Sequence, residues 1–316
     1  MQYKMTFKYN KINLVPLDAI RTINSGQVFL WENYNNSWYG IDGNYILKLT
    51  INDTKLYKYN ENRRYHLGLE NSDIDYNSFP ENENWIYHFF RLCDNQNKIN
   101  KTLSKDHIIF NIYNKYKGLR LIRQDPFQCI ISFVCASNTN IKRIRYMLKN
   151  ICKKFGKKVT YNGIDFNLFP NVNELAEASI QDLIGCGLGY RAKFVRSISN
   201  EIKNNLDLKS LKDMKYLNAK SELTKLFGIG NKIADCVLLF SLEKTEAFPI
   251  DIWVYRSLCQ YYRWMFENSS IRKNKKISEI EYKFVHEKVH EYFGEYSGYV
   301  QQYLYYHIRD SNKRKW

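Results

Sequence analysis

The chain lacks any long apolar run. None of its hydrophobic stretches approaches the roughly 20 residues that a membrane-spanning helix needs. Its opening residues, MQYKMTFKYNKINLV, also lack the apolar segment of a secretory signal peptide. Both absences argue against a membrane or secreted protein, and the sequence predicts a soluble, intracellular one.

Closely spaced cysteine pairs are missing as well. No two of the 7 cysteines follow the C-x-x-C spacing that is typical of zinc and iron–sulfur ligands. We therefore expect no metal site and no cofactor. In a reducing compartment these residues are predicted to be free thiols, several of them buried. They are Cys93, Cys129, Cys135, Cys152, Cys186, Cys236 and Cys259.

Acidic residues are scarce relative to basic ones. The chain has 32 Asp and Glu against 48 Lys and Arg, a formal net charge of +16, and a pI of about 9.3. A charge of this size points to polyanionic partners, namely DNA, RNA or an anionic membrane surface. A solvated basic surface with no particular partner is the alternative. With 316 residues, 44% of them hydrophobic, the chain is long enough for one or two domains with a substantial core.

The first third of the chain favours β-structure. Short runs of β-branched and aromatic residues at 28–33, 37–42, 44–51 and 55–60 predict strands. Asp42-Gly43 lies between two of them and is typical of a hairpin turn. An antiparallel sheet is therefore expected through about residue 60, followed by a polar, Asn-rich stretch.

From about residue 119 the hydrophobic period becomes helical. Asp125-Pro126 is typical of a helix start, and Ser179 to Asp182 follows a capping-box pattern. Residues 141–155 carry an apolar face at helical spacing opposite a basic face, and Gly156 ends that pattern. Further helices are expected at 187–198 and 297–308. The predicted fold class is α+β, with an N-terminal antiparallel β domain at 1–118 and a mostly α-helical domain at 119–316.

One segment, LFGIGNKIADCVLLFSLEKTEAFPIDIWVYRSL from Leu226 to Leu258, combines a glycine turn with reactive side chains. Gly228 and Gly230 flank Ile229, which allows a tight turn between helices and lets backbone N–H groups approach a phosphate. This helix–hairpin–helix pattern binds the DNA backbone without reading sequence. An ordinary packing corner between two helices is the structural alternative.

Lys232 lies in the first turn of the helix that follows. An amine is nucleophilic only when it is deprotonated, and both a helix N-terminus and burial disfavour the ammonium form. We therefore expect a lowered pKa and a reactive lysine there. A lysine that contacts a phosphate is an equally good interpretation of the position alone.

Asp251 follows Phe248-Pro249-Ile250 and precedes another helical run. At that position it is expected to cap the helix, which is a purely structural role. If the carboxylate also faces Lys232, it can stabilise positive charge that develops on a sugar ring. An amine and a carboxylate beside a DNA-binding turn suit attack at a sugar C1′, which leads to a Schiff base and strand cleavage by β-elimination.

These residues carry a family resemblance. LFGIGNKIADCVLLF and FPIDIW are similar to the helix–hairpin–helix, Gly/Pro…Asp superfamily of DNA glycosylases. Within it the chain most resembles the eukaryotic-type 8-oxoguanine DNA glycosylase/AP lyase family, and RLIRQDPFQCIISFVCASNTNIKRI, GCGLGYRAKFV and INSGQVFLW support that branch. The resemblance covers most of the chain. It implies a TBP-like N-terminal β domain and a helix–hairpin–helix glycosylase domain.

The resemblance also implies roles for individual residues. Lys232 matches the nucleophile of the bifunctional enzymes, and Asp251 matches their catalytic aspartate. Gly26 matches the glycine whose carbonyl accepts the N7–H that 8-oxoguanine has and guanine lacks. The remaining base-site matches are Cys236 and Tyr305, which sandwich the flipped base, and Gln301, which reads its Watson–Crick edge. From the residues alone, a strand-entry turn at the glycine and core packing for the other three would be the simpler interpretations.

A second group matches residues that fill the space left by the flipped base and hold the orphaned cytosine: Asn138, Arg143, Tyr190 and Arg191. The tyrosine is the aromatic wedge, and the arginines offer donors to cytosine O2 and N3. The implied function is excision of 8-oxoguanine, preferentially opposite cytosine, in base-excision repair. The implied partner is double-stranded DNA that contains 8-oxoguanine, bound by a monomer with no membrane contact. A phosphate contact is the alternative for each arginine.

The chain departs from the family pattern at four places. Phe227 replaces a proline before the hairpin, Thr139 interrupts a run of asparagines, and Tyr305 replaces phenylalanine. Trp253 replaces the family's histidine two residues past the aspartate, which puts the DNA-backbone contact of that histidine in doubt. The helix after Tyr305 does not align clearly.

Two other functions are compatible with part of the pattern. An endonuclease III-like glycosylase for oxidised pyrimidines shares the lysine and the aspartate. It normally carries four clustered cysteines after the hairpin region, where this chain has only Cys259 beyond Asp251, and it needs no N-terminal β domain. A non-catalytic helix–hairpin–helix DNA-binding protein would have no need for lysine and aspartate together.

Overall fold

The N-terminal part is built on an antiparallel sheet. In this computed structural model, which describes residues 17–51, 74–266 and 277–312, the strand order is β1-β2-β3-β4. These strands are β1 (Trp31–Tyr34), β2 (Ser37–Asp42), β3 (Tyr45–Ile51) and β4 (Ile74–Phe79), and they follow the short α1 (Ala19–Ile23). Three of the predicted strands and the hairpin at Asp42-Gly43 are confirmed, since Asp42 pairs with Tyr45 across the turn. The strand expected at 55–60 lies outside the described residues, and β4 was not expected.

Three helices lie where the sequence predicted none. They are α2 (Trp85–Phe89), α3 (Gln96–Leu103) and α4 (His107–Lys115). Local caps explain two of them, because the side chains of Asn95 and Asp106 accept hydrogen bonds from the first backbone N–H groups of α3 and α4. Both helices pack against α15 (Ser297–Ser311) near the C-terminus. The domain boundary at 118/119 stays a prediction.

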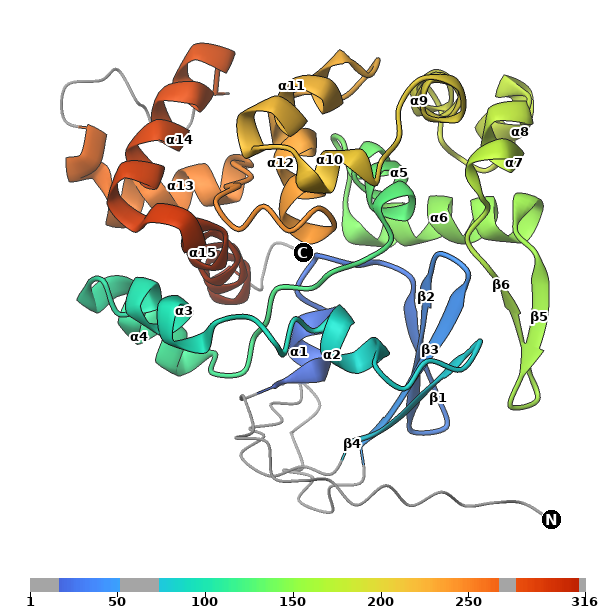
Figure 1. Ribbon diagram of the computed structural model, residues 1–316, viewed down its shortest axis with the longest axis horizontal. Coiled ribbons are helices and arrows are strands. Elements are labelled where there is room, and N and C mark those ends of the chain that lie inside the picture. Colours follow the sequence, from blue (N-terminus) through green and yellow to red (C-terminus); the bar gives the residue numbers. More distant parts are fainter. Residues whose placement is uncertain (1–16, 52–73, 267–276, 313–316) are drawn as a thin grey trace.

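The rest of the chain is mostly helical, as expected (Figure 1). The helices are α5 (Pro126–Cys135), α6 (Ile141–Phe155), α7 (Val172–Glu177), α8 (Ile180–Gly185), α9 (Arg191–Asn204), α10 (Ser210–Asp213), α11 (Tyr216–Lys225), α12 (Asn231–Phe240), α13 (Ile252–Tyr261) and α14 (Glu279–Phe293), followed by α15. Two 3₁₀ turns, Arg263–Phe266 and Gly294–Tyr296, and a hairpin of β5 (Lys158–Tyr161) and β6 (Ile164–Asn167) complete it.

The predicted helix ends are confirmed where side chains cap them. Asp125 accepts from the backbone N–H of Gln128 at the start of α5, with Pro126 in the first turn. Ser179 caps α8 in the same way, and Gly156 ends α6. Among the described residues, no helix is long and apolar enough to cross a membrane.

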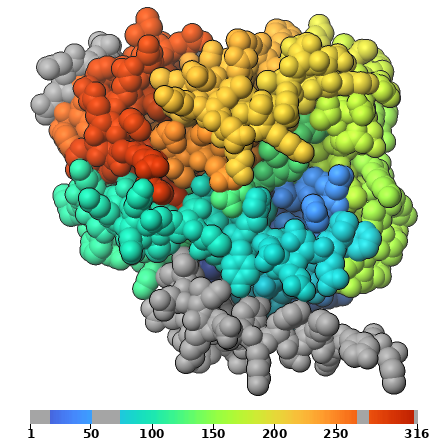
Figure 2. Space-filling model, viewed as in Figure 1, coloured from blue at the N-terminus to red at the C-terminus, as the bar shows by residue number. Residues whose placement is uncertain are grey.

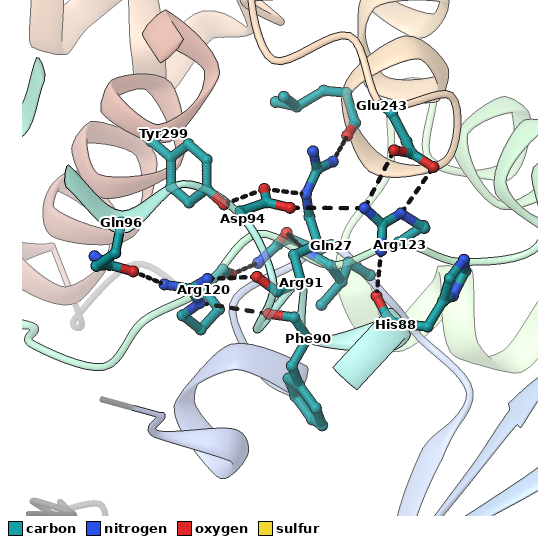
Figure 3. Close-up of polar contacts among 12 residues, drawn as sticks. Gln27, His88, Phe90, Arg91, Asp94, Gln96, Arg120, Arg123, Glu243 and Tyr299 are labelled. Carbon is teal, nitrogen blue, oxygen red and sulfur yellow. Dashed lines mark hydrogen bonds and ion pairs between the residues drawn. The ribbon is translucent and has the colours of Figure 1, made fainter. Parts of the chain in front are cut away.

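A polar junction joins the N-terminal part to the helices (Figure 3). The Asp94 carboxylate accepts from Arg91 Nε at 2.7 Å and from the Tyr299 hydroxyl of α15 at 2.7 Å. Arg123 donates to the His88 carbonyl at 2.9 Å and to Glu243 at 3.2 Å. Side chains from α15 and from the loop after α12 are thereby tied to the segment around α2.

A cleft of about 760 Å³ lies along the same boundary. Its lining includes Asp42 and Tyr45 at the β2–β3 turn, Trp85 of α2, and Lys212 of α10. On the face shown in Figure 2, the blue and cyan atoms of the N-terminal part meet the helical body directly. The lining reaches Ser241 at the C-terminal end of α12 and includes neither Lys232 nor Asp251.

The close approach of α15 to α12 depends on Gly298. A Cβ at this position would lie 2.3 Å from Leu239 Cδ1 and 2.7 Å from the Thr245 carbonyl oxygen. The Gly298 N–H donates to the same carbonyl at 2.8 Å. Because α15 also carries Gln301 and Tyr305, this glycine sets how closely those side chains approach α12.

We predict that Gly298→Ala destabilises the protein by about 1–3 kcal/mol, because an extra methyl would overpack this contact. Gly185→Ala is the matched control, since nothing lies within 4 Å of a Cβ at that exposed helical position. Removing a helical glycine there should leave stability unchanged or raise it by up to about 1 kcal/mol. Chemical denaturation of both variants checks this, and equal effects would contradict the packing account.

Candidate active site

The turn between α11 and α12 has the expected hairpin geometry. Gly228 adopts a φ of +95°, and a Cβ there would lie 2.5 Å from the Phe194 ring. Only glycine combines this backbone conformation with that contact. Ile229 is 5% exposed, so its side chain is buried beneath the turn. The turn leads directly into Asn231, the first residue of α12.

Lys232 lies in the first turn of α12, as predicted, but its protonation differs from the expectation. Its side chain hydrogen-bonds with Cys236 one helical turn later, and its Nζ lies 5.2 Å from the centre of the Phe133 ring. Burial lowers the pKa of Lys232, but the negative charge that Cys236, Asp251 and Tyr305 can carry outweighs it, and the net pKa is raised. The expected lowering was wrong because it considered the helix end and burial without these neighbours.

Asp251 caps α13, which confirms its structural role. Its Oδ1 accepts from the backbone N–H groups of Trp253 at 2.9 Å and Val254 at 2.8 Å. Burial raises the pKa of Asp251, while Lys232, these two hydrogen bonds and Arg309 act in the opposite direction. Both cap bonds use Oδ1, which leaves Oδ2 available for a second role.

Lys232 and Asp251 belong to one electrostatic cluster. Each shifts the pKa of the other, although no direct ion pair joins these two described side chains. Burial raises the pKa of the Cys236 thiol to about 12 and also raises that of Tyr305. At neutral pH the Cys236 thiol and the Tyr305 hydroxyl are therefore protonated, which leaves Asp251 as the acidic group of the cluster.

The residues matched to the damaged base gather beside this pair. A Cβ on Gly26 would lie 3.1 Å from the Tyr305 hydroxyl, and this glycine has a φ of +91°. Gln301, on the same helix as Tyr305, is 4% exposed and donates to the Pro249 carbonyl at 3.0 Å. Its Oε1 is buried without a hydrogen-bond partner. Such an orphaned acceptor is costly unless a ligand satisfies it.

The sequence alone did not predict a role for Arg309. This residue follows Tyr305 by four positions, as Tyr305 follows Gln301, so the three lie along one face of α15. Its guanidinium lies 5.4 Å from the centre of the Tyr305 ring and donates to the Ser25 carbonyl at 3.3 Å. Gly26 packs against it, since a Cβ there would lie 2.8 Å from Arg309 Nη1. Arg309 also favours the ionised form of Asp251. It therefore belongs to the site.

The residues matched to the opposite base form a neighbouring surface. Asn138 is exposed with a φ of +50°, and Tyr190 is 53% exposed. Arg143 is exposed and donates to the Gly187 carbonyl at 3.2 Å. Arg191 differs, because it is 8% exposed and donates to the Ser137 and Leu188 carbonyls. Arg191 thus braces the segment before Asn138.

No metal site emerges from the side chains that the structure describes. Nowhere in residues 17–51, 74–266 and 277–312 do three His, Cys, Asp or Glu side chains gather into a group that could hold an ion. The cluster around Lys232 contains an amine, a carboxylate and a thiol.

Comparison with known proteins agrees with this geometry. A family model described as HhH-GPD superfamily base excision DNA repair protein matches residues 131–281, and one for the N-terminal domain of 8-oxoguanine DNA glycosylase matches residues 10–130. A probable N-glycosylase/DNA lyase of Methanothermobacter thermautotrophicus is 32% identical, covering 66% of this chain and 70% of that one. An N-glycosylase/DNA lyase of Saccharomyces cerevisiae is 26% identical over 95% of this chain and 86% of its own.

Solved structures show the same relationship. The 8-oxoguanine glycosylase/lyase of Clostridium acetobutylicum, in complex with double-stranded DNA containing cytosine opposite 8-oxoguanine, is 28% identical with a TM-score of 0.77. The alignment covers 95% of this chain and 94% of that one. The fold and the matched family models define an HhH-GPD base-excision DNA repair glycosylase. Within that superfamily, the chain belongs to the 8-oxoguanine DNA glycosylase/AP lyase family.

The Cys236 thiol should resist alkylation. The thiolate is the reactive form, and with a pKa of about 12 only about one thiol in 10⁴ is ionised at pH 8. We predict that iodoacetamide labels the exposed Cys93 first, whereas labelling of Cys236 stays slow and accelerates as the pH rises. Peptide mass spectrometry at pH 7, 8 and 9 measures both sites. Rapid labelling of Cys236 at pH 7 would show instead that Lys232 holds it as a thiolate.

Proposed function

We propose that this protein excises 8-oxoguanine paired with cytosine and then cleaves the DNA strand at the resulting sugar. The observation that carries the proposal is the cluster in which Lys232, Asp251 and the base-site residues Gly26, Gln301 and Tyr305 lie together. Similarity to a glycosylase/lyase solved with 8-oxoguanine opposite cytosine supports the choice of substrate.

Lys232 is the proposed nucleophile. The ammonium first loses a proton, and its Nζ lone pair then forms a bond to C1′ while the C1′–N9 bond breaks and its electron pair leaves with the base. The released base takes up a proton. Nζ then gives up a proton, its lone pair forms the C1′=N bond as the C1′–O4′ bond breaks, and O4′ takes up a proton, so that the ring opens to a Schiff base. Loss of a C2′ proton with departure of the 3′ phosphate completes β-elimination.

Asp251 is the proposed electrostatic partner. The N-terminus of α13 holds Oδ1 in place, so the carboxylate needs no reorganisation when positive charge develops on the sugar. Its charge also attracts the ammonium of Lys232 before reaction. The absence of a direct ion pair between the two groups is compatible with a sugar placed between them.

Recognition of the lesion is assigned to the groups around Tyr305. The Gly26 carbonyl would accept the N7–H of 8-oxoguanine, whereas guanine presents a lone pair there and leaves two acceptors opposed. The buried, unpartnered Oε1 of Gln301 would accept from the Watson–Crick edge. Cys236 and Tyr305 would contact the two faces of the flipped base.

The surface formed by Asn138, Arg143, Tyr190 and Arg191 would hold the DNA from which the base has been flipped. The exposed ring of Tyr190 lies edge-on to that of Phe194, with 5.9 Å between the ring centres, and suits a wedge in the base stack. Arg143 would donate to cytosine, and Arg191 would do so after releasing its backbone contacts. The net charge of +16 favours binding to double-stranded DNA.

Borohydride trapping tests the nucleophile. We predict a covalent adduct with a duplex that contains 8-oxoguanine opposite cytosine, and none for Lys232→Gln. Lys225→Gln is the matched control, because this exposed lysine precedes the hairpin and pairs with Glu222 at 2.7 Å, and it should retain the adduct. Trapping only with thymine glycol would indicate a pyrimidine-specific enzyme. DNA binding with no adduct on any duplex would indicate a non-catalytic binding protein.

The choice of opposite base tests the second surface. Arg143→Ala should lower the preference for 8-oxoguanine opposite cytosine over adenine by about tenfold, the equivalent of one hydrogen bond from a charged donor. Lys142→Ala, an exposed neighbour, should weaken binding to both duplexes equally. Single-turnover rates on the two duplexes measure the ratio. An unchanged ratio in Arg143→Ala would rule out its proposed role.

A further inference from the structure

A buried cluster of ionisable side chains lies behind the proposed reaction site and takes no part in it. Asp235 of α12 is 0% exposed and accepts three hydrogen bonds. Its donors are the Tyr216 hydroxyl at 2.7 Å, the Lys220 Nζ at 2.8 Å and the Tyr282 hydroxyl at 2.6 Å. A buried carboxylate is stable only when its lone pairs are satisfied in this way.

Tyr282, which comes from α14, contacts two parts of the chain with one hydroxyl group. Its single proton goes to Asp235, the shorter contact and the charged acceptor. The hydroxyl oxygen then accepts from the backbone N–H of Ile250 at 3.2 Å. The Phe248 carbonyl, at 3.4 Å, lies beside the same hydroxyl group. The pKa of Tyr282 is raised by burial and by Asp235, which keeps the proton in place.

These two contacts join the helix of the nucleophile to the segment of the carboxylate. Asp235 follows Lys232 by about one helical turn, and Ile250 immediately precedes Asp251. The connection therefore runs from α12 through the Tyr282 hydroxyl to the backbone of the Phe248–Ile250 segment. Both ends lie in packed structure, since Asp235 of α12 is 0% exposed, Ile250 is 2% exposed and the next residue, Asp251, caps α13.

We propose that Tyr282 is a positioning residue that sets the separation between Lys232 and Asp251. It touches no substrate and acts through the two elements that it connects. A reaction between a bound sugar and two fixed groups is sensitive to displacements of about 1 Å, which can lower the rate about 100-fold. Removing the hydroxyl would let the Phe248–Ile250 segment shift relative to α12, while Asp235 would keep Tyr216 and Lys220 as partners. The inference rests on the proposed function of Lys232 and Asp251.

Tyr282→Phe tests the inference, with Tyr262→Phe as the matched control. Tyr262 is also buried and donates to a carboxylate, Asp106 Oδ1 at 3.1 Å, but it follows the opposite end of α13 from Asp251. Both variants should lose similar thermal stability. Below both melting temperatures, only Tyr282→Phe should slow base release and borohydride trapping, by about tenfold or more, with DNA affinity unchanged.

The outcomes distinguish failure of the positioning role of Tyr282 from failure of the proposed function. If the unaltered protein releases 8-oxoguanine and both variants do so at its rate, the positioning role is wrong and the proposed function stands. If the unaltered protein neither releases the base nor forms an adduct, the proposed function fails and the positioning role fails with it. A loss of DNA affinity that accounts for the slower rate would also overturn the positioning role.

Hydrogen exchange on the unaltered protein gives a test that does not depend on how Tyr282→Phe folds. The Ile250 amide donates to the Tyr282 hydroxyl and should be as protected from exchange as the interior amides of α12. Fast exchange at Ile250 beside slow exchange in α12 would show that the connection does not hold in solution.

Discussion

In the proposed reaction, an amine and a carboxylate from two different helices meet at one sugar carbon, and the rest of the site depends on that constraint. The glycine hairpin fixes the position of Lys232 in the first turn of α12, because Gly228 packs directly against Phe194. The N-terminus of α13 fixes Asp251 through two backbone hydrogen bonds. Asp251 is therefore a structural cap and a proposed catalytic group at once, and the two roles use different oxygens.

Local chemistry made much of the fold predictable. Asp125-Pro126, Ser179 and Asp42-Gly43 start a helix or close a hairpin by contacts within a few residues, so their structure follows from nearby sequence. The helices at 85–115 are harder to predict because each has at most 9 residues, too few for a clear helical period, although the side chains of Asn95 and Asp106 cap two of them. The β5–β6 hairpin did carry an Asn162-Gly163 signal, and the structure gives both residues positive φ.

The sequence predicted the positions of the two central residues of the site, but not all of the side chains that pack around them. The positions of Lys232 and Asp251 follow from the hairpin and from the Phe-Pro-Ile segment. The pKa of Lys232 did not follow, because its direction is decided by Cys236, Asp251 and Tyr305, which only the tertiary fold brings together. Arg309 and Tyr282 lie on helices whose contacts with the site depend on packing across the whole helical part, so no local pattern marks them.

The central claim is that Lys232 and Asp251 face the same sugar, and a crystal structure of Lys232→Gln with a duplex containing 8-oxoguanine opposite cytosine tests it most directly. The account predicts a flipped base between Cys236 and Tyr305, with C1′ of its sugar between residue 232 and the Asp251 carboxylate. A flipped base whose C1′ faces away from Asp251, or a lesion left stacked in a fully bound duplex, would contradict it.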